Sequence, residues 1–235
     1  MQLSIIIPTL NEETSLETTL KTLSHSPAAE VIVVDGGSTD QTLAIARQRG
    51  SRVLSAPRGR ASQMNAGARA AHGDVLLFLH ADTLLPPHFH REIEQALSHP
   101  QVIGGRFDVR FDPIDPHTLK EWVQEGLLHL VAFLMNLRSR WTHIATGDQA
   151  IFIRRRCFFQ LGGYPELPLF EDIELSKRMK RAGEIACLRS KVTTSARRWR
   201  KQGVVRTILL MWCLRLLYFL GLSPHLLWKV YRDVR

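Results

Sequence analysis

Short runs of large apolar residues recur along the first half of the chain, and polar or acidic groups follow each of them. The runs cover residues 3–7, 31–34 and 75–79. They are too short for typical helices and rich in β-branched or large residues, so they predict strands buried on both faces. Between the first two runs, residues 12–23 carry leucines at helical spacing. Strand and helix therefore alternate, which predicts an α/β fold with a mostly parallel, Rossmann-like sheet flanked by helices.

The same patterns give expected bounds for the remaining elements. In the first half the expected strands and helices are 3–7, 12–23, 30–35, 41–49, 52–55, an alanine-rich helix ending near 71, 74–79 and 88–97. From Arg106 to Phe111 apolar and charged residues alternate, which predicts a half-exposed strand. The later expected elements are a helix over 118–137, a strand over 147–153, and helices over 154–161 and 171–181.

Charge divides the chain more clearly than its length does. The 235 residues carry a net charge of +9 and three cysteines without metal-type spacing, which favours reduced thiols. Residues 191–235 hold 10 Lys or Arg and one acidic residue, so the excess lies at the C-terminal end. We therefore expect one domain over 1–190, with halves at 1–100 and 101–190, and a basic, apolar helical segment over 191–235. A basic face for nucleic acid is not expected.

The C-terminal segment has the composition of a membrane-interface helix. Residues 207–222 are apolar apart from Arg215, and they are too few for a span of about 20 residues. Basic residues precede this run and Trp228 and Tyr231 follow it, which favours attachment to an anionic membrane surface. Packing on the domain or on a partner, including a second copy, is the alternative. Because the first apolar run stops at Pro8 without a basic leader, we expect no signal peptide and a cytoplasmic, peripheral location at the inner membrane face.

Two pairs of polar residues, each containing an Asp, lie at the ends of predicted elements, where ligands commonly bind. His80 and Asp82 come directly after the strand over 74–79, at the sheet edge where α/β proteins hold ligands. Glu171 and Asp172 begin a helix, where the helix dipole favours their charges. A plain helix cap and an ordinary acidic first turn are the alternative interpretations. Arg60, before the N-terminus of the alanine-rich helix, would suit a phosphate.

Five segments, taken in order, resemble glycosyltransferase family 2 with the GT-A fold, and their context is similar to that of a compact bacterial subgroup. The segments are Ile5–Glu13, Val33–Asp40, Asn65–Gly67, the strand ending His80-Ala81-Asp82, and Glu171-Asp172 after Gly-Gly-Tyr-Pro. The resemblance implies transfer of a sugar from a nucleotide-diphosphate donor to an acceptor hydroxyl, with a divalent cation, Mn²⁺ or Mg²⁺. A lipid or small metabolite is the implied acceptor.

The resemblance also implies roles for individual residues. Asp172, with Glu171 beside it, would be the general base, and Asp82 with His80 would hold the cation. The implied nucleotide-sugar contacts are Pro8, Thr9, Asn11, Glu12, Asp35, Ser38, Arg60, Asn65, His80, Ala81 and Asp82. The implied acceptor-side residues are Gly147, Asp148, Gln149, Arg198 and Trp199, the last two similar to an Arg-Trp element that lacks its usual Gln here.

Two departures from the family pattern leave other functions open. His80 stands where the family has the first Asp of Asp-x-Asp, and Gly36 replaces a second Asp after Asp35. An imidazole suits Mn²⁺ better than Mg²⁺. The leading hypothesis is an inverting glycosyltransferase, since one base and an in-line attack invert the anomeric carbon. A sugar nucleotidyltransferase and a non-catalytic, membrane-associated binder of nucleotide sugars are the alternatives.

Overall fold

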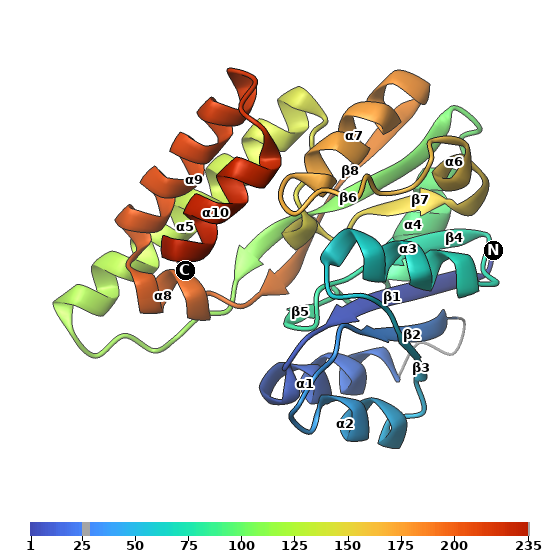
Figure 1. The fold of residues 1–235 in the computed structure, drawn as a ribbon, viewed down its shortest axis with the longest axis horizontal. Coiled ribbons are helices and arrows are strands. Elements are labelled where there is room, and N and C mark those ends of the chain that lie inside the picture. The colour runs from blue at the N-terminus through green and yellow to red at the C-terminus, as the bar shows by residue number, and fades with distance from the viewer. Residues whose placement is uncertain (25–28, 235) are drawn as a thin grey trace.

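One mixed sheet of eight strands, covered by helices on both faces, organises the chain (Figure 1). The computed structural model describes residues 1–24 and 29–234, with side chains up to Tyr231. The strand order is β3-β2-β1-β4-β7-β6-β8-β5. The strands are β1 (Leu3–Thr9), β2 (Ala29–Asp35), β3 (Arg52–Ser55), β4 (Val75–Phe78), β5 (Thr83–Leu84), β6 (Val102–Phe111), β7 (Phe152–Arg154) and β8 (Glu184–Thr194).

The first four strands of that order are parallel, as their buried apolar runs predict. In β1, Ile5 and Ile7 belong to one core, whereas Ile6 belongs to the core on the opposite face. The first core is covered by α1 (Glu13–Leu23), α2 (Thr42–Gln48) and α4 (Phe89–Leu97). The second is covered by α3 (Arg60–Ala70), α6 (Arg155–Gln160) and α7 (Glu171–Ala182). A strand with helices on both faces must be apolar throughout, which explains the unbroken runs.

Helix α3 lies close to the sheet because Gly67 permits it. A Cβ at this position would lie 2.4 Å from Cγ2 of Ile6 and 3.0 Å from Cγ2 of Val34. The alanine-rich sequence predicts this close packing. The approach brings the first turn of α3, with Arg60 and Gln63, to the carboxyl ends of β1 and β2.

The second half of the sheet corrects two expectations. β6 is buried from Val102 to Val109 and is not half-exposed. Arg106 and Asp108 lie under α5 (Leu119–Thr142), where Asp108 forms ion pairs with Arg106 and with Arg140 of α5. Only Arg110, near the end of the strand, is exposed. Alternation misled here because paired charges can be buried under a helix. The segment expected as a strand over 147–153 instead begins as a 3₁₀ turn, η1 (Gly147–Gln149), and only β7 is a strand.

The long strand β8 was not predicted, and it runs past residue 190. It pairs in parallel with β6 and, at its end, antiparallel with β5. Its side chains are mostly only partly buried, so it lacks the apolar run that marks β1 and β4. The division into regions at 1–100, 101–190 and 191–235 stays a prediction, and the side chains from residue 232 onward lie outside the described residues.

Three helices follow β8 and pack beside α5 and the start of α7 (Figure 1). They are α8 (Arg197–Gln202), α9 (Val204–Phe219) and α10 (Pro224–Val234). Leu214 of α9 and Leu227 of α10 are buried in a cluster with Phe170 and Ile173 at the N-terminus of α7. Within the described part of the chain, no helix has the length and apolar character needed to cross a membrane.

Candidate functional site

The loops after β1 and β2 are fastened to each other at the carboxyl edge of the sheet. The amide of Asn11 donates to Oγ of Ser38 at 2.9 Å, and the Asn11 side-chain oxygen accepts from the amide of Thr39 at 2.8 Å. Asn11 adopts the left-handed conformation (φ 55°), which Asn tolerates better than most residues. The two loops therefore form one surface.

Asp35 shapes this surface from beneath. It is buried, and its carboxylate accepts from the amides of Gly37 and Ser38, both at 2.9 Å, and from the Ser38 hydroxyl. Gln63, which sequence reasoning missed, donates to the carbonyl oxygens of Thr9 and Val34 at 2.8 and 2.7 Å. Pro8 and Thr9 are the last residues of β1, and Thr9 is almost fully buried. A Gln inside an alanine-rich helix gave no distinct signal in the sequence.

Glu12, in the loop after β1, and Asp82, in the turn after β4, form a second acidic group. Glu12 is close to Asp82, and burial and the charge of Asp82 raise the pKa of Glu12. Arg197 of α8 lies 3.5 Å from Oε2 of Glu12. The carbonyl of Ala81 accepts from the Thr19 hydroxyl at 2.7 Å, which fixes the turn between His80 and Asp82. The turn after β4 is thus tied to α1, the helix that follows the first loop.

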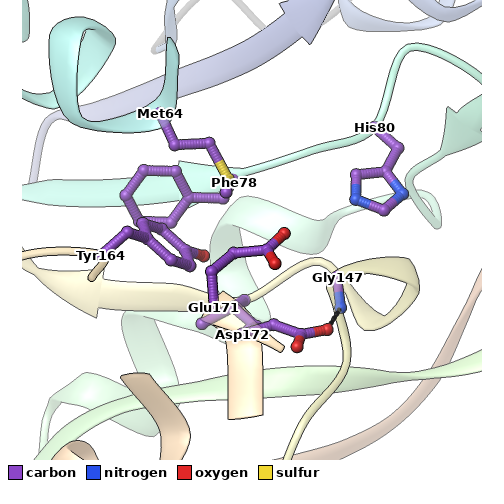
Figure 2. A pocket seen from close by; sticks show the side chains of 8 residues that line it. Met64, Phe78, His80, Gly147, Tyr164, Glu171 and Asp172 are labelled. Atoms are coloured by element: carbon purple, nitrogen blue, oxygen red, sulfur yellow. Dashed lines mark hydrogen bonds between the residues drawn. The ribbon is translucent and has the colours of Figure 1, made fainter. Parts of the chain in front are cut away.

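His80 joins the turn after β4 to η1 (Figure 2). Its Nδ1 lies 3.2 Å from Oδ1 of Asp148. Burial would raise the pKa of Asp148, but the hydrogen bond and charge of His80 and the charge of Arg60 lower it. Gly147 lies so close to the imidazole that a Cβ there would be 2.6 Å from Nε2 of His80. Both ring nitrogens therefore face η1.

Glu171 and Asp172 lie at the start of α7, opposite His80 (Figure 2). Phe170, in the left-handed conformation (φ 68°), turns the chain into the helix. Oδ2 of Asp172 accepts from the amide of Gly147 at 2.7 Å and Oδ1 from the amide of Ile173 at 2.7 Å. Glu171 is 7% exposed, and burial together with the charge of Asp172 raises its pKa to about 7. The two carboxyl groups thus differ in environment.

A small pocket separates these carboxyl groups from β4 and α3. Its lining residues are Met64, Phe78, His80, Gly147, Ile151, Tyr164, Glu171 and Asp172. Arg60 is not among these lining residues but is the first residue of α3. Desolvation lowers its pKa, but the carboxylates of Glu171 and Asp148 raise it more. Tyr164 is a further residue that the sequence marked only as part of an approach to α7; its ring packs edge-on against Phe78 at 4.8 Å.

Asn65 holds the Tyr164 segment against α3. Its amide donates to the Tyr164 carbonyl at 2.8 Å and its oxygen accepts from the Tyr164 amide at 2.9 Å. A Cβ at Gly163 would lie 2.8 Å from this Asn65 oxygen, so a side chain does not fit there. Asn65 therefore positions the pocket wall from behind.

Three residues expected on the acceptor side lie elsewhere or have structural partners. Gln149 is fully buried and donates to Oγ of Ser139 at 2.9 Å, which ties η1 to α5. Trp199 packs edge-on against Phe111 at 5.5 Å, away from the pocket lining. Arg198 donates to the Tyr231 hydroxyl and stacks over that ring at 4.6 Å. Its charge nonetheless acts on Asp148.

The residues at the end of β4 fit a cation that a ligand helps to hold. Among the described residues, no set of three or more His, Cys, Asp or Glu side chains could hold a metal ion alone. Mg²⁺ at nucleotide sites takes one or two carboxylates, and substrate phosphates supply further ligands. Asp82, with the carboxyl of Glu12 nearby, matches that donor set. Asp82 is better placed for this role than His80, whose nitrogens face Asp148 and Gly147.

Two curated proteins similar to this chain are named glycosyltransferases. Validoxylamine A glucosyltransferase of Streptomyces hygroscopicus subsp. limoneus is 35% identical over 130 residues, covering 49% of this chain and 28% of the relative. The "Probable glycosyltransferase YdaM" of Bacillus subtilis is 27% identical over 209 residues, covering 77% of this chain and 47% of the relative. This chain thus spans less than half the length of these two curated relatives.

Solved structures show the same fold at low identity. S. aureus TarS 1-349, in complex with UDP-GlcNAc, has a TM-score of 0.61 and 19% identity, covering 83% of this chain and 58% of that one. Glucosyl-3-phosphoglycerate synthase from Mycobacterium tuberculosis, in complex with Mn²⁺, UDP and glucosyl-3-phosphoglycerate, has a TM-score of 0.59 and 22% identity. The match covers 81% of this chain and 70% of that one. The expected GT-A-type α/β fold is thereby confirmed. A family model described as glycosyl transferase family 2 matches residues 4–160, and the chain therefore belongs to that family.

Proposed function

We propose that the protein transfers a sugar from a nucleotide-diphosphate donor to an acceptor hydroxyl, with inversion at the anomeric carbon. The observation that carries this proposal is the position of Asp172. Its carboxylate is fixed by the amide of Gly147 at 2.7 Å and lines the same pocket as His80, which ends the donor-side strand. A fixed carboxylate opposite a phosphate-binding edge suits a general base that deprotonates the attacking hydroxyl.

The donor side would stabilise the leaving group. As the sugar departs, negative charge develops on the nucleotide diphosphate, and the Arg60 guanidinium at the start of α3 would stabilise that charge. Asp82, with Glu12 near it, would hold the divalent cation, which supplies further positive charge to the diphosphate when bound. The joined loops at Asn11 and Ser38 provide a preformed edge for the nucleoside.

A thermal-shift screen of nucleotide sugars with Mn²⁺ tests the donor half of the proposal. One nucleotide sugar should raise Tm saturably in the wild type, since a ligand that binds only the folded state stabilises it. Asp82→Asn should weaken this shift, and Arg156→Gln, an exposed change on α6, should leave it intact. Hydrolysis or transfer of that donor should then require Asp172. Binding without any Asp172-dependent turnover would instead identify a non-catalytic binder.

We also propose that the protein works at the inner face of the cytoplasmic membrane. The support is a set of large, exposed apolar side chains on α5 and α9, among them Trp122, Phe133, Trp141, Trp212 and Phe219. The exposed basic residues Arg197, Lys201 and Arg206 lie on or next to the same helices. Apolar side chains flanked by basic ones are typical of surfaces that bind anionic lipid.

Vesicle flotation tests this location. The full chain should float with vesicles that contain anionic lipid and less with neutral ones, and Trp212→Ser with Phe219→Ser should reduce flotation strongly. Phe159→Ser, an exposed apolar residue on α6, is the control. If the wild type does not float and its mass in solution is that of a dimer, a second copy covers this surface and the membrane proposal fails.

A further inference from the structure

Two arginines on the acceptor side of the pocket are placed together without partners. They are Arg138 of α5 and Arg215 of α9. Burial lowers the pKa of both arginines; the charge of Arg215 lowers that of Arg138 further, whereas the charge of Asp172 acts on both in the opposite direction. The charge of Asp148 also opposes the lowering at Arg215. Leu214, next to Arg215 on α9, packs with Phe170 and Ile173, which flank Glu171 and Asp172 in the chain. The pair therefore lies near the start of α7.

Their guanidinium groups contain buried nitrogens that bond to nothing in the protein. Nε and Nη2 of Arg138 and Nε of Arg215 are inaccessible to solvent and have no hydrogen-bond partner among the described residues. Neither arginine forms an ion pair within 4.0 Å in that part of the chain, although Asp172 attracts both at longer range. A buried donor without a partner carries the full cost of its lost hydration.

Three other arginines near α5 and α8 have partners for their charged groups, whereas Arg155 of α6 also has a buried Nε that is unpaired among the described residues. Arg140 of α5 bonds to Asp108, and Arg200 of α8 bonds to Asp112 and Glu125. Arg106 leaves its Nε unpaired, but its Nη atoms bond to Asp108 and to the Asn136 carbonyl. Two adjacent guanidiniums repel each other and would be unfavourable as purely structural elements. Their forked donors match the oxygens of a phosphate or carboxylate.

We propose that Arg138 and Arg215 bind an anionic group, a phosphate or carboxylate, on the acceptor, so that the acceptor is an alcohol that also carries a negative charge. The identification of the bound molecule as the acceptor rests on the proposed function. The anion site itself rests only on the two arginines. An anion there would neutralise the two adjacent positive charges, and the hydroxyl of the same molecule would lie near Asp172. The anion comes either from a soluble phosphorylated or carboxylated alcohol or from a lipid headgroup.

Thermal shift with inorganic phosphate, at constant ionic strength, tests the anion site. Phosphate should raise Tm of the wild type by roughly 5–10 °C at about 100 times its Kd. In Arg138→Gln and Arg215→Gln this rise should fall by at least half, whereas Arg156→Gln should keep it. Without phosphate, Arg138→Met and Arg215→Met should melt above the wild type, because each removes an unpaired buried charge. Lower melting of both Met variants, with an unchanged phosphate shift in the Gln variants, would overturn the site.

Two further arms separate the sources of the anion and the two proposals. If glycerol 3-phosphate raises Tm of the wild type but not of the Arg138→Gln protein, the acceptor is soluble. If glycerol 3-phosphate has no such effect and flotation on phosphatidic acid vesicles depends on Arg138, the anion is a lipid headgroup. If the UDP-induced shift, and not the phosphate shift, depends on both arginines, they bind the donor and the acceptor assignment is wrong. A phosphate shift that needs both arginines in a protein without sugar-nucleotide turnover would keep the anion site and refute the proposed function.

Discussion

The donor-side loops, residues 10–12 and 36–40, and the acceptor-side wall, made of α5, η1, α9 and the start of α7, differ in how fully their polar groups are paired. In the loops, Asp35 and Asn11 bond to backbone amides, and Gln63 closes the sheet edge beneath them. In the wall, Glu171 is buried beside Asp172, and Arg138 and Arg215 contain unpaired nitrogens. The loops therefore hold their shape without a ligand, whereas the wall has interactions that a bound ligand would complete.

The largest expected effect comes from replacing Asp172, the proposed general base in the acceptor-side wall. Asp172→Asn can keep only one of the hydrogen bonds from the amides of Gly147 and Ile173, because the Asn side-chain nitrogen cannot accept one. It also removes proton acceptance, so transfer should fall by about 10²-fold or more. Donor binding, measured by thermal shift, should stay unchanged because the loops are built separately. Turnover close to that of the wild type would refute the assignment of Asp172 as the base.

A pH-dependent stability change should come from Glu171. Its pKa is about 7 in the folded protein and near 4.5 in the unfolded chain. Between these values the folded state binds more protons, so the charge of Glu171 makes stability fall as pH rises through that window. Relative to the wild type, the free energy of unfolding of Glu171→Gln should be unchanged at pH 4.5 and higher by up to about 3 kcal/mol at pH 8. Urea unfolding at both pH values measures this.

Glu184→Gln is the matched control for Glu171→Gln, since Glu184 is exposed at the start of β8. Its unfolding free energy should differ from the wild type by the same small amount at both pH values. If Glu171→Gln behaves in the same way, the burial of Glu171 does not set its protonation.

In the donor half, a substitution that disturbs packing tests the structure better than one that removes a charge. Gly67→Ala places a methyl group 2.4 Å from Ile6, so α3 must move away from the sheet, at a cost of about 1–3 kcal/mol. Because α3 carries Arg60 and Gln63, donor binding should weaken as well. Denaturant unfolding and the nucleotide-sugar thermal shift together test this, and unchanged values in both would show that the helix adapts freely.

The smallest expected effect is the counterpart of Gly67→Ala in the wall. Gly126 lies inside α5, and a Cβ there meets nothing within 4 Å. Gly126→Ala should therefore raise the free energy of unfolding by up to about 1 kcal/mol, through helix propensity alone. A loss of stability would show that α5 is covered at this position by a partner.

The donor half could be predicted closely from the sequence because its signals are local. The unbroken apolar runs of β1 and β4 and the small residues of α3 each indicate burial or close packing within a few residues. On the acceptor side, the acidic start of α7 is a local signal of the same kind. The family resemblance was confirmed, and the fold with it. The roles of the individual site residues, Asp82 and Asp172 among them, stay predictions.

The rest depended on contacts between segments that are distant in the chain. β8 has no apolar run because it is only partly covered, and the charges of β6 are buried because Arg140 of α5 lies over Asp108. Arg138 and Arg215 stand in separate helices, and each looks like an ordinary basic residue. The sequence by itself determined the parallel part of the sheet and the order of the His80–Asp82 and Glu171–Asp172 pairs along the chain, since periodicity and chain order encode them. Only the tertiary structure placed two unpaired guanidiniums beside Asp172, because burial and pairing are properties of the packed chain.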